Sequence, residues 1–441
     1  MSNFELALKL FLQMAVILGV CRLISLLGRR YLGQTEVVCE MIAGVLLGPS
    51  LFGLLAPAAK DWLFPSARLA LAGGATIPNP SMSIIFAISQ IGVVVYMFLI
   101  GLEFNTELIR GRMRSAGLVS GAGILVPFVL GGGAALLISD NGALFSPGIS
   151  PWAAAIYLGA SMSITAFPML ARMLHERGIA KTQLGTLALA AGSMDDAVAW
   201  CLLAVVLASI QAQIGIAVLA IGGGIAYVAL MIAVGRPLFK RIFEGRMRRD
   251  GGRVTMQTLT LLMAVVMFCA WFTDVIGIYA IFGGFIAGTV MPRGAFAEQV
   301  RERTEHLATA FLVPTFFVFS GLNTQLGLVN TPALWGITLL VIVIAVAGKG
   351  LACALAARAA GESWRDSATV GTLMNARGLM ELIILNIGLE KGIITPTLFT
   401  MMVIMAITTT LMTSPLFNLI YKDSGFRSQK SEGRRQELAK E

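Results

Sequence analysis

The sequence predicts an all-α protein that crosses a membrane many times, and three observations indicate this class. The chain has 441 residues, of which 57% are hydrophobic and only 13% are charged, whereas about 25% of the residues in soluble domains are charged. Apolar runs long enough for a membrane-spanning helix, about 20 residues, recur from one end of the chain to the other. Basic residues gather in alternate connections between these runs.

Apolar runs bounded by turn residues and charges define thirteen candidate spans. No small-residue cleavage site follows the first run, so we interpret it as a retained helix rather than a signal peptide. The predicted spans lie near residues 10–28, 37–55, 83–102, 116–138, 152–171, 184–211, 214–235, 255–273, 276–292, 306–322, 333–357, 366–388 and 396–419.

The basic residues predict the orientation of the chain. Most of the 33 Lys and Arg residues fall in the C-terminal tail and in the loops that follow odd-numbered spans. Because loops rich in Lys and Arg stay in the cytoplasm, we expect the N-terminus outside and the C-terminus inside. The net charge of +9 then reflects topology, and we expect no nucleic-acid partner. A transmembrane domain of residues 1–421 is followed by a short basic cytoplasmic tail, residues 422–441.

Cysteine and histidine usage argues against several classes of function. The five cysteines form no CxxC pair, and the chain has only two histidines. This pattern is atypical of a disulfide framework, a structural zinc site or a haem protein. No nucleophile–base pair, phosphate loop or metal-ligand spacing stands out. We therefore expect neither an enzyme nor a bound cofactor.

Two segments of the chain recur in its second half. MIAGVLLGP at 41–49 resembles IFGGFIAGT at 281–289, and MFLIGLEFNTEL at the end of the third span resembles FFVFSGLNTQL at the end of the tenth. Equivalent spans are seven apart, so the two copies must cross the membrane in opposite directions. Inverted repeats of this kind are typical of secondary transporters. The alternative is chance similarity between Gly-rich apolar segments.

Two adjacent carboxylates, Asp195 and Asp196, lie midway along the sixth span between apolar runs. Ionisable groups at that depth are costly and mark function. Neighbouring positions on a helix project in different directions, so both carboxylates can border one cavity. Their oxygens can hold a hard monovalent cation or a proton, and this mutual exclusion is the chemistry of antiport. The alternative is an acid pair tied to Lys or Arg for packing.

The fifth span carries residues that disturb a helix. Pro168 removes a backbone donor and disfavours helix at the residue before it, and Ser163 and Thr165 can bond to carbonyls of the preceding turn. A helix broken here would direct free carbonyls and helix ends at an ion beside the Asp pair. The alternative is a simple proline kink.

Charged residues in three other spans need partners. Arg377 follows Asn375 in the irregular NARG segment of the twelfth span, where it either neutralises carbonyl ends or pairs with Glu381. Lys349 lies well inside the eleventh span, and the Asp pair is its natural partner unless it snorkels to a membrane face. Glu40, near the start of the second span, either lines an entrance or caps the helix.

These motifs resemble those of the monovalent cation:proton antiporter-2 family, which includes NapA-type sodium/proton exchangers, Kef-type potassium transporters and plant CHX exchangers. The resemblance runs from about Glu40 to Pro415 and is most specific in EMIAGVLLGPSLFG, SMSITAFPMLARML, SMDD and LMNARGLMELIILNIGLEKGI. It implies a homodimer with an NhaA-like antiporter fold, in which helices broken at 163–168 and 375–378 cross within a mobile core domain. Unlike Kef-type members, the chain is expected to carry no nucleotide-binding regulatory domain.

The resemblance also implies roles for individual residues. Asp196 matches the family's near-invariant aspartate, and with Asp195 it would form the site for Na+ or K+ and for the proton, assisted by Ser163 and Thr165. In relatives with a doubled acid the core lysine, here Lys349, pairs with the first aspartate, and transport tends to be electrogenic.

The sequence therefore predicts a secondary transporter that exchanges Na+ or K+ for H+ by alternating access in a bacterial cell membrane. One alternative is a Kef-like potassium efflux channel or transporter, although a channel needs a filter of carbonyls or a ring of acids and no TVGYG-like run occurs. The other is a symporter for an organic anion, which the doubled aspartate disfavours.

Overall fold

The computed structural model describes residues 3–65, 69–70, 76–77, 80–103, 113–139, 142–179, 182–211, 214–277 and 279–421. The predicted basic tail, residues 422–441, lies outside these ranges, as does the FNTEL end of the first repeat copy. The described residues are almost entirely helical, as the sequence predicts.

The first half of the described chain consists of helices and one small antiparallel ladder. The two strands, β1 (Leu69–Ala70) and β2 (Thr76–Ile77), pair with Leu69 opposite Ile77. The sequence analysis did not predict this ladder, because two-residue strands leave no alternating pattern to detect. The helices are α1 (Asn3–Leu32), α2 (Glu36–Leu47), α3 (Phe52–Leu55), α4 (Pro57–Leu63), α5 (Pro80–Glu103), α7 (Met113–Ile138), α8 (Pro151–Ser163), α9 (Phe167–Glu176) and α10 (Gln183–Gln211).

The second half contains helices in which π-helical segments are inserted. The π-helical segments are η1 (Met231–Gly235), η2 (Lys240–Glu244), η3 (Ala308–Leu312) and η5 (Val346–Leu351), and η4 (Leu326–Leu328) is a 3-10 turn. The α-helices are α11 (Ile214–Leu230), α12 (Arg236–Phe239), α13 (Gly245–Arg249), α14 (Met256–Val275), α15 (Ala280–Val290), α16 (Ala295–Leu307), α17 (Val313–Leu322), α18 (Pro332–Ala345), α19 (Ala352–Ala359), α20 (Trp364–Met374), α21 (Leu379–Glu390) and α22 (Pro396–Ile420).

The predicted count of thirteen spans is not confirmed. Within the described ranges, nine helices are long and apolar enough to cross a membrane. Two of the predicted spans are each divided into two helices, α8 with α9 and α20 with α21. The predicted ninth span corresponds to α15, which has 11 residues and is too short by itself for a bilayer of about 30 Å.

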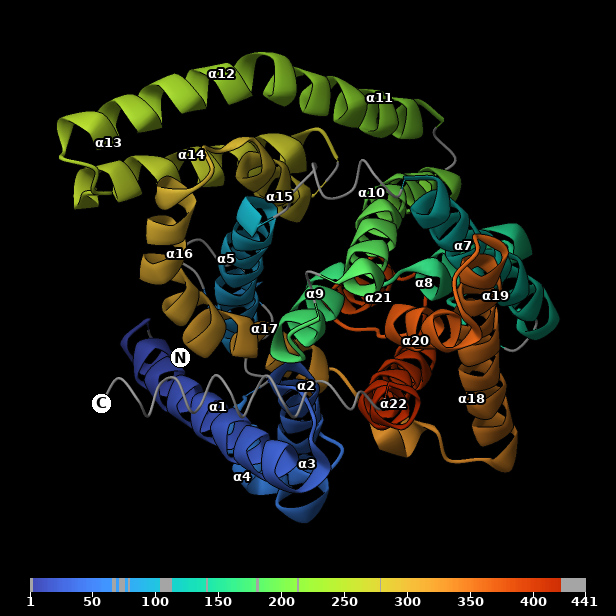
Figure 1. The fold of residues 1–441 in the computed structure, drawn as a ribbon. Coiled ribbons are helices and arrows are strands. Elements are labelled where there is room, and N and C mark those ends of the chain that lie inside the picture. Colours follow the sequence, from blue (N-terminus) through green and yellow to red (C-terminus); the bar gives the residue numbers. More distant parts are fainter. Residues whose placement is uncertain are drawn as a thin grey trace.

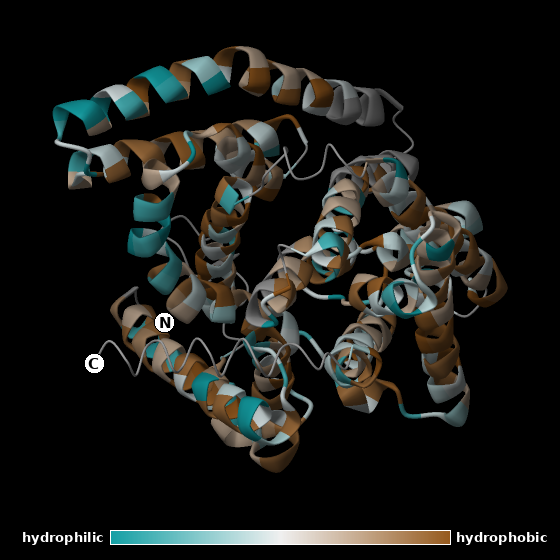
Figure 2. Ribbon diagram, viewed as in Figure 1, coloured by the Kyte–Doolittle hydropathy of each residue, from teal (hydrophilic) through white to brown (hydrophobic). Residues whose placement is uncertain are grey.

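The outer faces of the long helices are apolar. Leu137 is 84% exposed, Phe4 72% and Trp152 71%. Hydrophobic residues predominate along most long helices, whereas α13 and α16 are hydrophilic (Figure 2). Soluble monomers rarely expose large contiguous apolar patches, so these faces are suited to contact with lipid.

The helices form two groups. In the first group α5 packs against α15 and α17, and α2 packs against α1 and α17. In the second group α7 packs against α8, α10 and α19, and α20 packs against α19 and α22. Figure 1 shows the second group on the right and the helix formed by α11, α12 and α13 along the top. Both helices that are interrupted in the middle belong to the second group.

The helices of the two repeat copies exchange partners. Gly44 on α2 lies against Gly321 on α17, and Gly101 on α5 lies against Gly288 on α15, each pair so closely that a Cβ would overlap the opposite backbone. The first copy supplies α2 and α5, and the second supplies α15 and α17. Thus α2 of the first copy packs on α17 of the second, and α15 of the second copy packs on α5 of the first. This reciprocal packing is the arrangement expected of repeats related by a two-fold axis in the membrane plane.

Candidate ion site

Two interrupted helices meet in the second group. Helix α8 ends at Ser163 and α9 begins at Phe167, while α20 ends at Met374 and α21 begins at Leu379. The first interruption lies just before Pro168, where proline disfavours helix. The two unwound segments touch, because the backbone N–H of Ala166 donates to the carbonyl of Ala376 at 3.3 Å. Both interruptions fall within the segments that the sequence predicts to be broken.

Lys349 and Asp195 form a fully buried ion pair. The Lys349 Nζ lies 3.0 Å from Asp195 Oδ2, and both side chains have no exposed surface. The ammonium also donates to the carbonyl of Gly123 at 3.0 Å and to the carbonyl of Ser163. An ammonium has three donors, so all three have acceptors. The pairing of Lys349 with the Asp pair, rather than with a membrane face, is the geometry that the structure shows.

The first interruption supplies a side-chain hydroxyl and a backbone carbonyl to this ion pair. Thr165 donates its hydroxyl proton to Asp195 Oδ2 at 2.5 Å, the same oxygen that Lys349 approaches. The hydroxyl of Ser163 is directed elsewhere, to the carbonyls of Gly159 at 2.7 Å and Ile124 at 3.0 Å. Ser163 therefore reaches the site through its backbone carbonyl rather than through its side chain.

Asp196 is 2% exposed, and its carboxylate oxygens are among the buried oxygens in this region of the described chain that make no hydrogen bond of normal geometry. Among the described residues, both carboxylate oxygens of Asp196, the Oδ1 of Asp195 and the Oδ1 of Asn375 are buried and make no hydrogen bond of normal geometry. The backbone N–H of Phe167 is a donor close to the Asp196 carboxylate, in a geometry looser than that of a normal hydrogen bond. Buried acceptors without donors are costly, and a proton or a hard cation with oxygen preference satisfies them.

Arg377 performs both of the roles that its sequence position allows. Its Nη1 lies 3.4 Å from Glu381 Oε1, and both side chains are buried. Its Nη2 donates to the carbonyl of Met162 at 2.8 Å, which is one of the last carbonyls of α8. The guanidinium thus neutralises a carbonyl end of one broken helix while it is held by the first turn of the other.

Glu40 lies apart from these residues. It is 6% exposed and lines a cavity of about 230 Å³ together with Arg22, Glu36 and Thr309. None of the residues that line this cavity belongs to the Asp pair or to the two interruptions. The structure therefore does not bring Glu40 to the candidate ion site.

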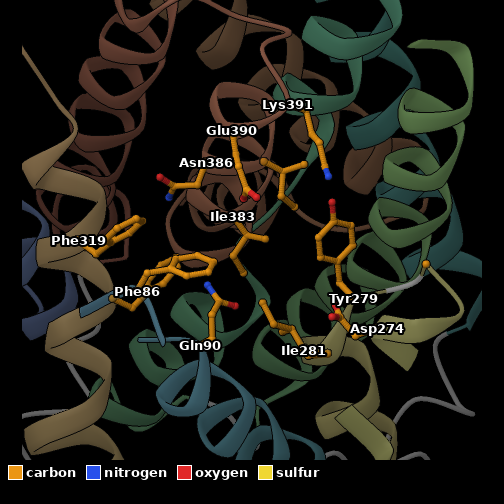
Figure 3. A pocket seen from close by; sticks show the side chains of 14 residues that line it. Phe86, Gln90, Asp274, Tyr279, Ile281, Phe319, Ile383, Asn386, Glu390 and Lys391 are labelled. Carbon is orange, nitrogen blue, oxygen red and sulfur yellow. The ribbon is translucent and has the colours of Figure 1, made fainter. Parts of the chain in front are cut away.

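A cleft of about 500 Å³ lies between α21 and the first group of helices. Figure 3 shows Asn386 and Glu390 of α21 facing Gln90 of α5 across this cleft, with Asp274 and Tyr279 along one side. Asn386 Nδ2 donates to Ser320 Oγ on α17 at 2.8 Å. The cleft thus separates the two groups of helices, and one side-chain hydrogen bond joins them beside it.

Several groups at the site were not predicted from the sequence. Gly123 and Met162 contribute carbonyls, and Cys353, one turn after Lys349, donates to the Val119 carbonyl at 3.6 Å. Thr410 on α22 bonds to the backbone of Arg377. Carbonyl contributions carry no sequence signal. The glycines on both sides of Lys349 were the one available hint that its helix is irregular there.

A helical membrane protein whose inverted repeats enclose two crossed, interrupted helices and a buried carboxylate–lysine cluster is built as a secondary transporter for a small cation. Sequence comparison agrees with this class. Residues 15–419 match the family "Sodium/hydrogen exchanger, transmembrane", and the chain belongs to this family.

Individual relatives support this membership, and a solved structure shows the same fold. The chain is 41% identical to the Na(+)/H(+) antiporter NhaS4 of Synechocystis over 94% of its length and 97% of that protein. It is 31% identical to K(+)/H(+) antiporter 1 of Saccharomyces cerevisiae over 96% of its length but 47% of that protein. The fold is similar to that of the sodium proton antiporter MjNhaP1 of Methanocaldococcus jannaschii, with a TM-score of 0.61, 14% identity and coverage of 95% and 99% of the two chains.

The chain spans about half the length of the plant relatives that it matches. Cation/H(+) antiporter 18 of Arabidopsis thaliana is 33% identical over 98% of this chain and 51% of its own length. The similarity therefore covers about half of that protein.

Proposed function

We propose that the protein exchanges Na+ or K+ for H+ across the membrane, with Asp195 and Asp196 as a shared site for the cation and the proton. The observation that carries this proposal is the fully buried Lys349–Asp195 pair beside Asp196, whose two buried oxygens make no hydrogen bond of normal geometry among the described residues. At such a site the positive charge of an entering cation can be balanced by the release of a proton. The named activities of the relatives are of the same type.

The charge balance defines the exchange. Without a cation, Lys349 neutralises Asp195, and a proton neutralises Asp196. A Na+ or K+ that enters takes oxygens from both carboxylates, so Asp196 releases its proton and the ammonium of Lys349 withdraws from Asp195. If Lys349 also releases a proton, two protons leave for each cation and the exchange moves net charge. Thr165, which donates to Asp195 Oδ2, remains to orient that carboxylate.

Access to the site would alternate by movement of the second group of helices, the core, against the first group. The cleft beside α21 is lined by none of the ion-site residues, so an access path through it would have to open further toward the Asp pair as the groups move. Asp274 and Lys391 at this cleft lie in connections that the distribution of basic residues places outside. The N-terminus would accordingly be outside and the C-terminus in the cytoplasm of a bacterial cell. We further propose that two copies associate through the first group of helices.

Exchange in proteoliposomes tests the proposal. Purified protein is reconstituted with an internal pH dye, and Na+ or K+ is added in turn. Wild-type protein should give a cation-driven pH change, and Asp196→Asn should abolish it while the protein still elutes as a folded species. Asp61→Asn is the matched control, because it removes a carboxylate that is exposed and paired with Lys60.

Full cation-dependent proton flux in Asp196→Asn would contradict the assignment of this carboxylate. Cation flux in wild-type protein without coupled proton movement would favour a channel. No response to any monovalent cation would contradict exchange itself.

A further inference from the structure

The hydroxyl of Thr410 on α22 is bonded to both backbone groups of Arg377. It accepts the Arg377 N–H at 3.0 Å, and it lies 2.7 Å from the Arg377 carbonyl oxygen. Thr410 has no exposed surface. Arg377 is in the unwound segment between α20 and α21, where backbone groups lose their helical partners and need others in a membrane.

The hydroxyl has one proton and two acceptors for it. The carbonyl of Ala406, one turn earlier on α22, also lies 2.7 Å away. A threonine in a helix commonly donates to such a carbonyl of its own helix. Acceptance of the Arg377 N–H is independent of that choice, so Thr410 stays attached to the unwound segment in either rotamer of its proton.

This attachment reaches the ion pair along two short paths. The carbonyl of Ala376, next to Arg377, receives the N–H of Ala166, which follows Thr165, a donor to Asp195. On the other side the Asn375 side chain faces Gly350, which follows Lys349, so that a Cβ added at Gly350 would meet it at 3.8 Å. The two donors that share Asp195 Oδ2 are thus each one residue away from a contact with the segment that Thr410 holds.

We propose that Thr410 is a positioning residue that fixes the unwound segment of the twelfth span and so sets the cation affinity of the Asp pair. This inference rests on the proposed exchange function. Loss of the hydroxyl leaves the backbone groups of Arg377 without this partner and lets the segment move, which alters the placement of Thr165 and Lys349 around Asp195.

Three variants isolate the hydroxyl. Thr410→Val keeps the shape of the side chain and removes the hydroxyl, and Thr410→Ser restores it. Thr409→Val is the matched control, because the Thr409 hydroxyl is buried in the same turn but donates only to Met405 and Ala406 of its own helix. Thr410→Ala replaces Thr410→Val if the valine variant does not fold.

Two readouts come from proteoliposome exchange: the apparent KM for the cation and the dependence of that KM on pH. The third is the cation concentration that gives half of the maximal increase in the unfolding temperature of the purified protein. Thr410→Val should raise the KM and the half-stabilising concentration about tenfold, as expected for one lost buried hydrogen bond, and should displace the pH profile. Thr410→Ser and Thr409→Val should stay close to wild type in all three.

Wild-type KM and pH profile in Thr410→Val would overturn the inference, and so would equal effects of Thr410→Val and Thr409→Val. Wild-type protein that neither exchanges nor is stabilised by any monovalent cation would instead overturn the proposed function and this inference with it.

Discussion

Lys349 Nζ and Asp195 Oδ2 lie 3.0 Å apart with no exposed surface on either side chain. The same oxygen accepts the Thr165 hydroxyl at 2.5 Å, so both donors act on one oxygen and leave Asp195 Oδ1 without a donor among the described residues. In the proposed exchange, a cation that reaches Asp195 would bind the buried Oδ1 first, and Lys349 would then withdraw from Oδ2.

Removal of Lys349 should destabilise the protein. Breaking a buried pair by removing one partner leaves an uncompensated charge and costs about 3–5 kcal/mol, so Lys349→Ala should lower the unfolding temperature of the purified protein clearly. The double variant Lys349→Ala/Asp195→Asn removes both charges and should recover part of the loss. Strictly additive effects in these variants, measured by thermal unfolding, would mean that the two side chains do not stabilise each other. Lys60→Ala, which breaks an exposed pair with Asp61, should change little.

Arg377→Lys should impair exchange although it keeps the charge. The guanidinium binds Glu381 and the Met162 carbonyl with two different nitrogens, and an ammonium cannot reproduce this planar fork. We expect a rate loss of about tenfold or more, equivalent to one lost charge-assisted hydrogen bond. Arg358→Lys is the control, because Arg358 lies at an exposed helix end where its Nη1 donates to the backbone carbonyl of Glu362. Equal rates for the Arg377 and Arg358 variants would show that the fork is dispensable.

Gly321→Ala should disrupt the contact between the repeat copies. A Cβ there would overlap the backbone of Gly44, so α2 and α17 would have to separate, at a cost of about 1–3 kcal/mol. Gly121→Ala on α7 is the control, since its Cβ would meet no atom within 4 Å. Thermal unfolding of both variants compares the two sites. An unchanged unfolding temperature for Gly321→Ala would contradict the close approach of these helices.

Ser320→Ala should change the rate of exchange but not the affinity for the cation. It removes the hydrogen bond from Asn386 across the two groups of helices, while Asn386 keeps its bond to the Leu382 carbonyl of its own helix. If the groups move relative to each other, the maximal rate should shift and the apparent KM should remain. A shifted KM with an unchanged maximal rate would place the effect of Ser320 at the ion site instead.

The sequence predicts much of this architecture because membrane insertion leaves strong local signals. Long apolar runs, the Pro168 interruption and the isolated charges are all visible in a short window. Because a buried lysine needs a counter-charge, the sequence by itself predicts that Lys349 pairs with the two adjacent aspartates.

Other features depend on contacts between distant segments. The sequence allows the Ser163 hydroxyl either to bond to carbonyls of the preceding turn or to assist at the Asp pair, and the structure shows it at the carbonyls of Gly159 and Ile124. Thr410 is one of four threonines within six residues of α22, TTTLMT beginning at 408, and its contact with Arg377 distinguishes it. The π-helical segment at Lys349 has only the two glycines that flank the lysine as a hint in the sequence, and they do not predict its type.

The pH dependence of the apparent cation KM tests the shared site most directly. If one proton and the cation compete for the Asp pair, each decrease of one pH unit in the acidic range should raise the KM roughly tenfold, by the reciprocity of linked binding. Two competing protons would give a steeper dependence. Measured in proteoliposomes with Na+ or K+ at a clamped voltage, a KM that rises in this way with an unchanged maximal rate is the predicted result. A KM that does not depend on pH would contradict a shared site.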